Sequence, residues 1–343
     1  MRPRFQWDLG CRSLPLGVRT LVMGVLNVTP DSFSDGGRYL SPQAAIDHGL
    51  ALLDEGADIL DIGGESTRPG TPVEAGLRPF VAGAVSADEE LDRVLPVIEA
   101  IKRQRPQAVL SIDTYKARVA RLAIDSGVEI VNDVSGFTWD PDMALTVAER
   151  PCGAILMHTR GLPHEWPTQP PSPDIVTQVR EELRTRISET LDRGMLRRAI
   201  VLDPGFGFGK NLDENYPLLA YFAEFQILGF PLLAAVSRKG FLRHTVTARL
   251  AQVEASALRA ASAPKETGAP FLVHSADAEA LKSPPAPLAP ATRLHATLAA
   301  TVAAALAGAH IVRVHDVRPA VEALAIADAI LHAAENPRAV TPS

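Results

Sequence analysis

The chain has 343 residues, 46% of them hydrophobic and 22% charged, which is enough apolar content for one large core or two ordinary ones. Its net charge of −6, with Lys and Arg mixed among Asp and Glu, leaves no broad basic face for a nucleic-acid backbone, so we expect no nucleic-acid partner. Cys11 and Cys152 lack the spacing of a zinc site or a disulfide framework, which favours a reducing, cytoplasmic setting. We expect neither a signal peptide nor a membrane anchor, because no apolar run approaches the ~18 residues that a membrane helix needs.

Short apolar runs alternate with longer segments whose apolar residues recur at helical spacing, the pattern of repeated β/α units. The runs long enough for buried strands are 21–26, 58–62, 108–112, 129–131, 153–157, 199–202, 231–236 and 310–314. The segments with helical spacing are 41–55, 87–103, 115–126, 174–193, 215–226, 292–307 and 318–334. Ser41 and Pro42 offer an N-cap and a first-turn proline for the first of these helices.

Eight parallel strands, each followed by a helix, bury both faces of their sheet by closing into a barrel. The sequence therefore favours an α/β fold of one domain, a (β/α)8 TIM barrel. A doubly wound open sheet is the alternative architecture. The barrel is favoured because polar residues follow nearly every strand, around one rim, instead of clustering at one switch point.

Two stretches interrupt this rhythm. Residues 247–290 are rich in Ala, Ser and Pro, so we predict a partly disordered insertion in the seventh β/α connection. Residues 77–84 lengthen the loop after the second strand, and long loops on an active rim often act as lids. The expected organisation is an N-terminal extension at 1–20, the barrel at 21–335 and a tail at 336–343.

The first two strand-end loops suit an anionic ligand. Residues 27–37 form a polar, Gly-rich loop whose Asn27 either places an oxygen on a hard cation such as Mg2+ or caps a turn. In residues 61–70, Gly63 and Gly64 let the backbone approach a ligand, and Arg68 supplies a forked cation for phosphate or carboxylate. A mobile, solvated connection is the alternative for this second loop.

Three later strand ends carry a carboxylate or an amide: Asp113, Asn132 and Asp203. A flat heterocycle with an aminopyrimidine edge presents adjacent N–H donors that such groups match. Each residue is also placed to cap the following helix. That alternative is weaker for Asp203, because Pro204 and the alternating glycines after it shape a specific loop.

The last two strand ends supply basic side chains: Arg238, Lys239, Arg313 and His315. Barrels often bind phosphate after strands seven and eight, so phosphate or pyrophosphate is the expected ligand, with solvated surface charge as the alternative. His158, after the fifth strand, fits either a rim position or a structural histidine.

The motifs at 23–37, 61–70 and 203–210, with those at 237–239 and 313–316, resemble the signatures of the dihydropteroate synthase family. The resemblance runs from about residue 20 to 335, and only the segment 247–290 and the lengthened second loop lie outside it. It implies a Mg2+-assisted transferase that joins 6-hydroxymethyl-7,8-dihydropterin pyrophosphate to p-aminobenzoate, giving 7,8-dihydropteroate and pyrophosphate. It also implies a homodimer.

The resemblance assigns roles position by position. The pterin-binding positions are Asp113, Asn132, Met157, Asp203 and Lys239, of which Asp113, Asp203 and Lys239 are the expected catalytic residues. The pyrophosphate-binding positions are Asn27, which also helps to hold the magnesium, Asp61, Arg68, Arg313 and His315. The p-aminobenzoate positions are Phe33, Asp35, Thr67, Arg68, Pro69, Phe208 and Ser237.

Two other functions fit parts of the sequence. A pterin-binding methyltransferase barrel shares the pterin pocket, but it should lack the anion-binding residues and the loop at 27–37. A catalytically silent barrel would serve as a scaffold or partner subunit. Every motif position carries a chemically competent side chain, which argues against the silent barrel.

Overall fold

A computed structural model describes residues 2–29, 42–67, 70–76, 81–262 and 292–335 of the chain. Within them, eight parallel strands form one sheet in the order β8-β7-β6-β5-β4-β3-β10-β9. Their bounds are β3 Leu21–Asn27, β4 Ile59–Gly63, β5 Val109–Asp113, β6 Ile130–Asp133, β7 Gly153–Met157, β8 Ile200–Asp203, β9 Leu233–Ala234 and β10 Ile311–Val314. A parallel bridge between Leu202 and Leu232 links the two ends of this order, so the sheet closes as the predicted (β/α)8 barrel.

The strands are buried on both faces, which explains why they appear in the sequence as apolar runs without polar alternation. Seven of the predicted strands are confirmed within two residues at each end. The predicted strand 231–236 is paired only at Leu233–Ala234. Pro231 has no N–H for the ladder, and its carbonyl accepts the N–H of Leu202 at 3.0 Å, so this segment contributes a short strand.

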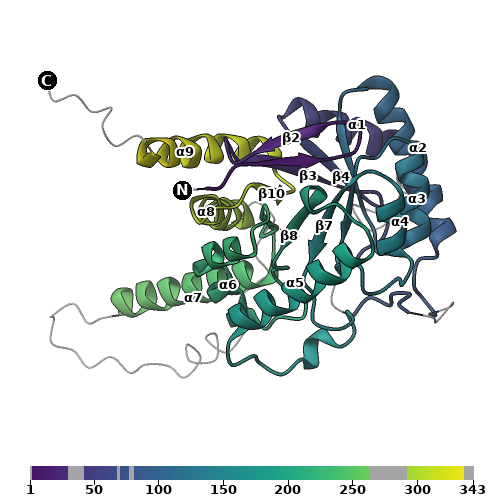
Figure 1. Ribbon diagram of the computed structural model, residues 1–343. Helices are drawn as coiled ribbons and strands as arrows, with labels where there is room; N and C mark the ends of the chain where they lie inside the picture. The colour runs from purple at the N-terminus through teal and green to yellow at the C-terminus, as the bar shows by residue number, and fades with distance from the viewer. Residues whose placement is uncertain (1, 30–41, 68–69, 77–80, 263–291, 336–343) are drawn as a thin grey trace, which may run out of the picture.

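Helices surround the strands, with α1 to α4 along one side and α8 and α9 along the other (Figure 1). The α-helices of the described part are α1 Pro42–Asp54, α2 Ala87–Gln104, α3 Ala117–Asp125, α4 Met143–Glu149, α5 Ile175–Asp192, α6 Asn215–Ala220, α7 Gly240–Ser262, α8 Thr292–Leu306 and α9 Val317–Glu335. Short 3-10 helices are η1 Trp166–Thr168, η2 Arg197–Ala199, η3 Leu212–Glu214 and η4 Phe222–Leu228. The helix predicted at 215–226 is thus divided into α6 and η4.

Two helices were not predicted, α4 and α7. The predicted insertion of residues 247–290 begins inside α7, which continues to Ser262, so its first part is helical and the partial disorder stays a prediction. The alanines of this segment have high helix propensity. Residues 263–291 lie outside the described part of the chain, as does the predicted N-cap Ser41.

An antiparallel hairpin of β1 Phe5–Asp8 and β2 Ser13–Leu16 packs against the N-terminal end of the barrel, within the segment expected as an extension. Its Trp7, Leu9 and Leu16 are buried with side chains of the barrel interior, among them Ile155. The indole N–H of Trp7 donates to the carbonyl of Ala199 at 2.8 Å. The hairpin therefore closes the barrel at the end opposite to the strand termini that carry the polar motifs.

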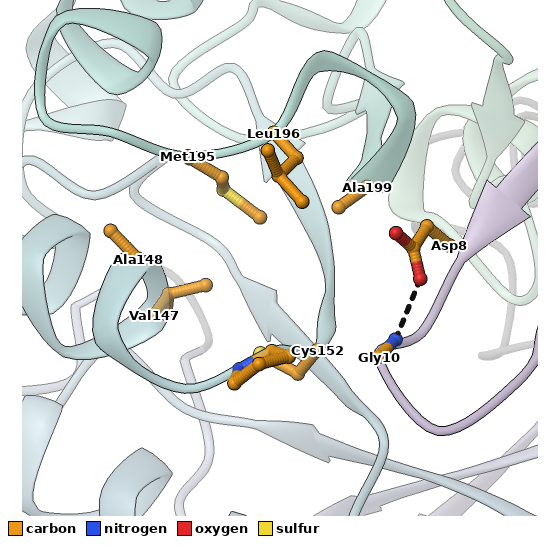
Figure 2. Close-up of a pocket in the computed structure, with 9 residues that line it drawn as sticks. Asp8, Gly10, Val147, Ala148, Cys152, Met195, Leu196 and Ala199 are labelled. Atoms are coloured by element: carbon orange, nitrogen blue, oxygen red, sulfur yellow. Dashed lines mark hydrogen bonds between the residues drawn. The ribbon is translucent and has the colours of Figure 1, made fainter.

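A small cavity of about 60 Å³ lies beside this hairpin, near the N-terminal ends of β7 and β8 (Figure 2). Val147, Cys152 and Met195 contribute apolar lining. Asp8, also in its wall, accepts the N–H of Gly10 at 2.9 Å and so stabilises the hairpin turn. The polar groups that line the cavity do not point to a common position, as they do in a typical ligand site.

None of the helices in the described ranges combines the length and the apolar character required to cross a membrane.

Replacing Trp7 tests the role of the hairpin. We expect Trp7→Ala to lower the free energy of unfolding by about 3–5 kcal/mol, because it leaves a large cavity under the barrel. Trp7→Phe keeps an aromatic ring and loses the bond to Ala199, so we expect a loss of only about 1 kcal/mol. Urea denaturation measures both values, and a loss below 1 kcal/mol for Trp7→Ala would show that the hairpin is not part of the core.

Candidate functional site

Polar side chains gather where the parallel strands end, because the carboxyl ends of all barrel strands lie at one rim. Asn27 is the last residue of β3, Asp113 of β5 and Asp203 of β8. Asn132 lies one residue before the end of β6, and Met157 is the last residue of β7. The structure thus places these five predicted site residues at the same end of the barrel.

A guanidinium held between two carboxylates joins strands across this rim. Arg313, on β10, donates from Nε to Asp61 Oδ2 at 2.6 Å and from Nη2 to Asp113 Oδ2 at 2.5 Å. Asn132 Nδ2 donates to the same oxygen of Asp61 at 3.0 Å. Asp61 is 0% exposed, so its charge depends on these partners in place of water.

Burial controls the protonation of this network. It raises the pKa of Asp113 to about 7; Arg313 opposes the shift, whereas the charge of Asp61 adds to it. Burial disfavours the charged form of Arg313, but Asp61 and Asp113 outweigh it and raise the pKa of the guanidinium. Arg313 therefore stays charged while Asp113 changes its protonation near neutral pH.

Asp203 and Lys239, both in the described part of the chain, lie beside this network and influence each other through their charges, without a direct ion pair. Asp203 is buried and accepts the N–H of Gly205 at 2.8 Å, and burial raises its pKa to about 6. Burial lowers the pKa of Lys239 to about 8, although Asp203 favours the charged form. Lys239 Nζ lies 3.9 Å from the ring centroid of Phe208, so one ammonium faces both a carboxylate and an aromatic ring.

The Gly-rich loop after β8, which carries Phe208, is held in shape by Lys210, a residue whose role the sequence did not reveal. The buried ammonium donates to the carbonyls of Gly205 at 2.8 Å and Phe208 at 3.1 Å, and it contacts His158 Nδ1 at 2.9 Å. Gly205 has φ +71°, and a Cβ there would lie 1.9 Å from the carbonyl oxygen of His158. Only glycine fits that position.

His158 has the structural role that the sequence left open. Its Nε2 lies 2.9 Å from Glu182 on α5, and burial lowers its pKa to about 4. The imidazole is thus neutral near pH 7, and together with Lys210 it links the Gly-rich loop to α5.

Ser237 and His315 form a contact between the last two strand ends. Ser237 Oγ lies 3.0 Å from His315 Nδ1 and accepts the backbone N–H of His315 at 3.2 Å. Arg238, which the sequence grouped with the anion-binding cations, pairs instead with Asp316 at 3.1 and 2.6 Å. Its φ of +58° turns the backbone between Ser237 and Lys239.

The second loop starts at a buried ion cluster that the sequence did not predict. Lys116 Nζ lies 2.6 Å from a carboxylate oxygen of Glu65 and 2.6 Å from one of Glu90 on α2. Glu65 belongs to the motif at 61–70, and Lys116 follows the end of β5 by three residues. Their positions near strand ends indicate that they lie at the same rim, but sequence spacing does not tell which carboxylate forms an ion pair with which lysine.

Some predicted site residues lie outside the described part of the chain: Phe33, Asp35, Arg68 and Pro69. Thr67 is described and half-buried. The structure therefore brings together the predicted pterin-binding set and part of the predicted anion-binding set.

Oxygen ligands for a hard cation are present at the ends of β3 and β5. A Cβ placed on Gly63 would lie 3.9 Å from Asn27 Oδ1 and 3.7 Å from Asp113 Oδ2, so both oxygens line one small region. Asp61 Oδ1 is buried without a hydrogen-bond partner among the described residues. Those residues contain no cluster of three or more His, Cys, Asp or Glu suited to a metal. A few protein oxygens fit Mg2+, which keeps waters and binds substrate phosphates.

Comparison with known proteins gives a consistent result. Residues 23–315 match the family described as pterin binding enzyme. The dihydropteroate synthase of Escherichia coli K12 is 38% identical over 317 residues, covering 92% of this chain and 94% of that protein. The Xanthomonas albilineans dihydropteroate synthase solved with 4-aminobenzoic acid matches with a TM-score of 0.72 and 36% identity, covering 96% and 99% of the two chains. The Burkholderia cenocepacia enzyme complexed with 7,8-dihydropteroate matches with a TM-score of 0.72 and 33% identity, covering 98% and 99%.

Removing Arg313 tests the charge balance of the rim. We expect Arg313→Met to lower the free energy of unfolding by about 3–5 kcal/mol at pH 8, because two carboxylates then remain buried without their cation. The loss should be smaller at pH 5, where Asp113, with its raised pKa, takes up a proton and becomes neutral. Urea denaturation at the two pH values measures the difference.

Arg238→Met is the matched control, because its pair with Asp316 lies on the same rim but is 41% exposed at the arginine. We expect a loss below about 1 kcal/mol for it. Equal losses for the two variants, or a loss that does not change with pH, would contradict the charge-balance account.

Proposed function

The chain belongs to the family of dihydropteroate synthases, and we propose how the end of its barrel carries out their transferase reaction. The amine of p-aminobenzoate displaces pyrophosphate from the exocyclic methylene of 6-hydroxymethyl-7,8-dihydropterin pyrophosphate, giving 7,8-dihydropteroate for folate biosynthesis. The observation that carries this proposal is the convergence of Asp113, Asn132, Asp203, Lys239 and Arg313 at one rim.

The pterin is recognised by the carboxylates and the amide. Its aminopyrimidine edge presents adjacent N–H donors, which in our proposal bind to Asp203 and Asn132, and the burial of both side chains supports this assignment. The N–H of Gly205 fixes the orientation of Asp203, and Asp61 fixes that of Asn132. Met157, buried at the end of β7, offers an apolar contact for the flat ring.

The pyrophosphate is received by the cations on the other side of the rim. Two carboxylates hold the guanidinium of Arg313 in one orientation, so a bound anion meets a cation that is already positioned. His315, in contact with Ser237, and Arg68 extend this set in our proposal. Asn27 and the oxygens near it suit Mg2+, which when bound would neutralise charge on the departing pyrophosphate.

The aromatic amine binds between the Gly-rich loop and the early loops. Phe208 is fixed by an edge-on contact with Trp166, with ring centroids 5.1 Å apart, and by Lys239 over its face. We assign Ser237, Thr67 and the early-loop residues Phe33, Asp35 and Pro69 to the same subsite. These groups hold the amine nitrogen near the methylene carbon, which lowers the entropic cost of bringing two substrates together.

The displacement is dissociative in this proposal. The carbon–oxygen bond breaks early, the pyrophosphate leaves with the electron pair, and the electron-rich pterin spreads the positive charge. Ionised Asp113 and Asp203 stabilise that cation, while Arg313 and His315 stabilise the leaving group. The amine nitrogen then forms the new carbon–nitrogen bond and passes one proton to the released pyrophosphate. Because the pterin cation is a strong electrophile and the leaving group accepts the proton, little acid or base catalysis is required of the protein.

We further propose that the enzyme works in the cytoplasm as a homodimer. The outer helices support an interface, because Ile326 and Ile330 lie one turn apart on α9 and are exposed, as is Leu306 at the end of α8.

The product assay tests the function directly. We expect purified protein with Mg2+ to convert the pterin pyrophosphate and p-aminobenzoate to dihydropteroate with release of pyrophosphate, and chelation of the metal to slow the reaction. Asp203→Asn is the control, and we expect it to lower kcat/KM by about 10²-fold or more, because it removes a charge that stabilises the transition state. Pterin binding without product would favour the catalytically silent barrel.

The dependence of rate on pH tests the roles of the two carboxylates. We expect kcat/KM for the pterin pyrophosphate to fall as the pH decreases from about 7 to 6, because Asp113 and Asp203, with pKa values of about 7 and 6, become protonated and no longer stabilise a cation. In Asp113→Asn we expect kcat/KM to be lower at every pH, and its decrease should occur at a lower pH than in the wild type. A fall that keeps its midpoint in this variant would belong to the phosphates of the substrate and would contradict the role of Asp113.

A further inference from the structure

We propose that Tyr115 and Lys116 act together as positioning residues that hold the first part of the second loop at two points, Glu65 and Glu74, for the two substrates. This inference rests on the proposed function, because that function assigns Thr67 and its neighbours to the pyrophosphate and the amine. The two positioning residues lie two and three residues after the end of β5, the strand that carries Asp113.

Lys116 holds the first end of the loop. Its ammonium lies 2.6 Å from Glu65, where the loop begins, and 2.6 Å from Glu90 on α2, and all three side chains are buried. One oxygen of each carboxylate lacks a hydrogen-bond partner among the described residues. The ammonium is the cation that compensates both charges, and the Tyr115 hydroxyl also interacts with Glu65. Removing the ammonium would leave two buried carboxylates without compensation, and Glu65 would then move towards water.

The backbone next to Glu65 reinforces this attachment. Arg93 on α2 donates from Nη1 to the carbonyl of Gly64 at 2.7 Å. A Cβ on Gly64 would lie 2.8 Å from side-chain atoms of both Glu90 and Val94, so the loop starts in direct contact with the helix. The first end of the loop is therefore fixed to α2, and Lys116 joins that contact to the end of β5.

Tyr115 holds the loop at the second point, Glu74. Its hydroxyl accepts the backbone N–H of Glu74 at 3.0 Å, and the side chain is buried. The ring packs edge-on against Trp139 with centroids 5.1 Å apart, and the carbonyl of Trp139 accepts the N–H of Gly76 at 2.6 Å. Between the two points, the N–H of Gly70 donates to the carbonyl of Pro163 at 3.0 Å.

Two fixed points restrict the conformations that the segment between them can adopt. A ligand that needs one of these conformations binds with an apparent affinity reduced by the fraction of molecules that have it. Loss of either attachment should therefore raise KM for both substrates, and saturating substrate should restore the rate. General destabilisation would instead lower the amount of active protein without changing KM.

The test compares Tyr115→Phe and Lys116→Met with the wild type. Tyr115→Phe removes the hydroxyl that accepts the N–H of Glu74 and interacts with Glu65, and it keeps the ring. We therefore expect KM for p-aminobenzoate and for the pterin pyrophosphate to rise by about 3- to 10-fold with kcat within about twofold. Lys116→Met should raise both KM values by more than about tenfold. Hydrogen exchange at the amide of Glu74, measured without substrates, should be about tenfold faster in Tyr115→Phe.

Lys102→Met is the matched control, because Lys102 also lies near Glu129 in a shielded ion pair at 2.7 Å, but near the last turn of α2, away from the rim. We expect it to lower the melting temperature and to leave both KM values within about twofold. Should Lys116→Met fail to fold, the Tyr115→Phe measurements decide alone.

Unchanged exchange at Glu74 in Tyr115→Phe would overturn the inference, as would equal KM changes in Lys116→Met and Lys102→Met. The exchange measurement requires no activity. If the wild type made no dihydropteroate, the proposed function would fail while faster exchange at Glu74 would still support the attachment of the loop by Tyr115.

Discussion

The site depends on one buried arginine whose charge two carboxylates compensate. Arg313 reaches from β10 to Asp61 on β4 and Asp113 on β5, so three strands of the barrel are joined through its side chain. None of these charges would be stable in that position alone, because burial costs several kcal/mol per ion. The same compensation holds a guanidinium and two carboxylates at fixed distances before any ligand arrives, which is the preorganisation that charge separation in the reaction requires.

The barrel supplies the geometry for this compensation. In a closed parallel sheet the strand ends meet at one rim, so residues far apart in the chain, such as Asp61 and Arg313, become neighbours. The N-terminal hairpin fills the other end with Trp7 and its apolar neighbours. The polar groups of the candidate site consequently lie at the opposite end, where the strands lead into the longer loops.

The position of each polar site residue at the end of a strand was predictable from the sequence, because apolar runs mark the strands and Asp113 or Asp203 follows such a run directly. The hydrogen bonds and ion pairs between these residues were not predictable, because they depend on which side chains the barrel brings within 3 Å of one another. Asp61 illustrates the difference: the motif containing it was recognised, but its bonds to Arg313 and Asn132 were not expected. The cluster of Lys116, Glu65 and Glu90 was missed for the same reason, and α7 was missed because alanine-rich sequence suits both helix and linker.

The charges at the rim also explain why binding of the pyrophosphate half of the substrate requires positive charge from groups outside this network. Once the pH exceeds the pKa of about 7 for Asp113, the buried Lys210, whose pKa is also about 7, is losing its charge. Three carboxylates, of Asp61, Asp113 and Asp203, then face mainly the cations of Arg313 and Lys239 within the described residues. This excess of negative charge favours a cationic pterin but opposes a diphosphate placed beside it. We therefore infer that binding of the intact substrate depends on positive charge brought by the second loop or by a divalent cation. That dependence gives a reason for the loop to be attached at Glu65 and at Glu74, since a cation on a freely moving loop would lose much of its interaction with the anion.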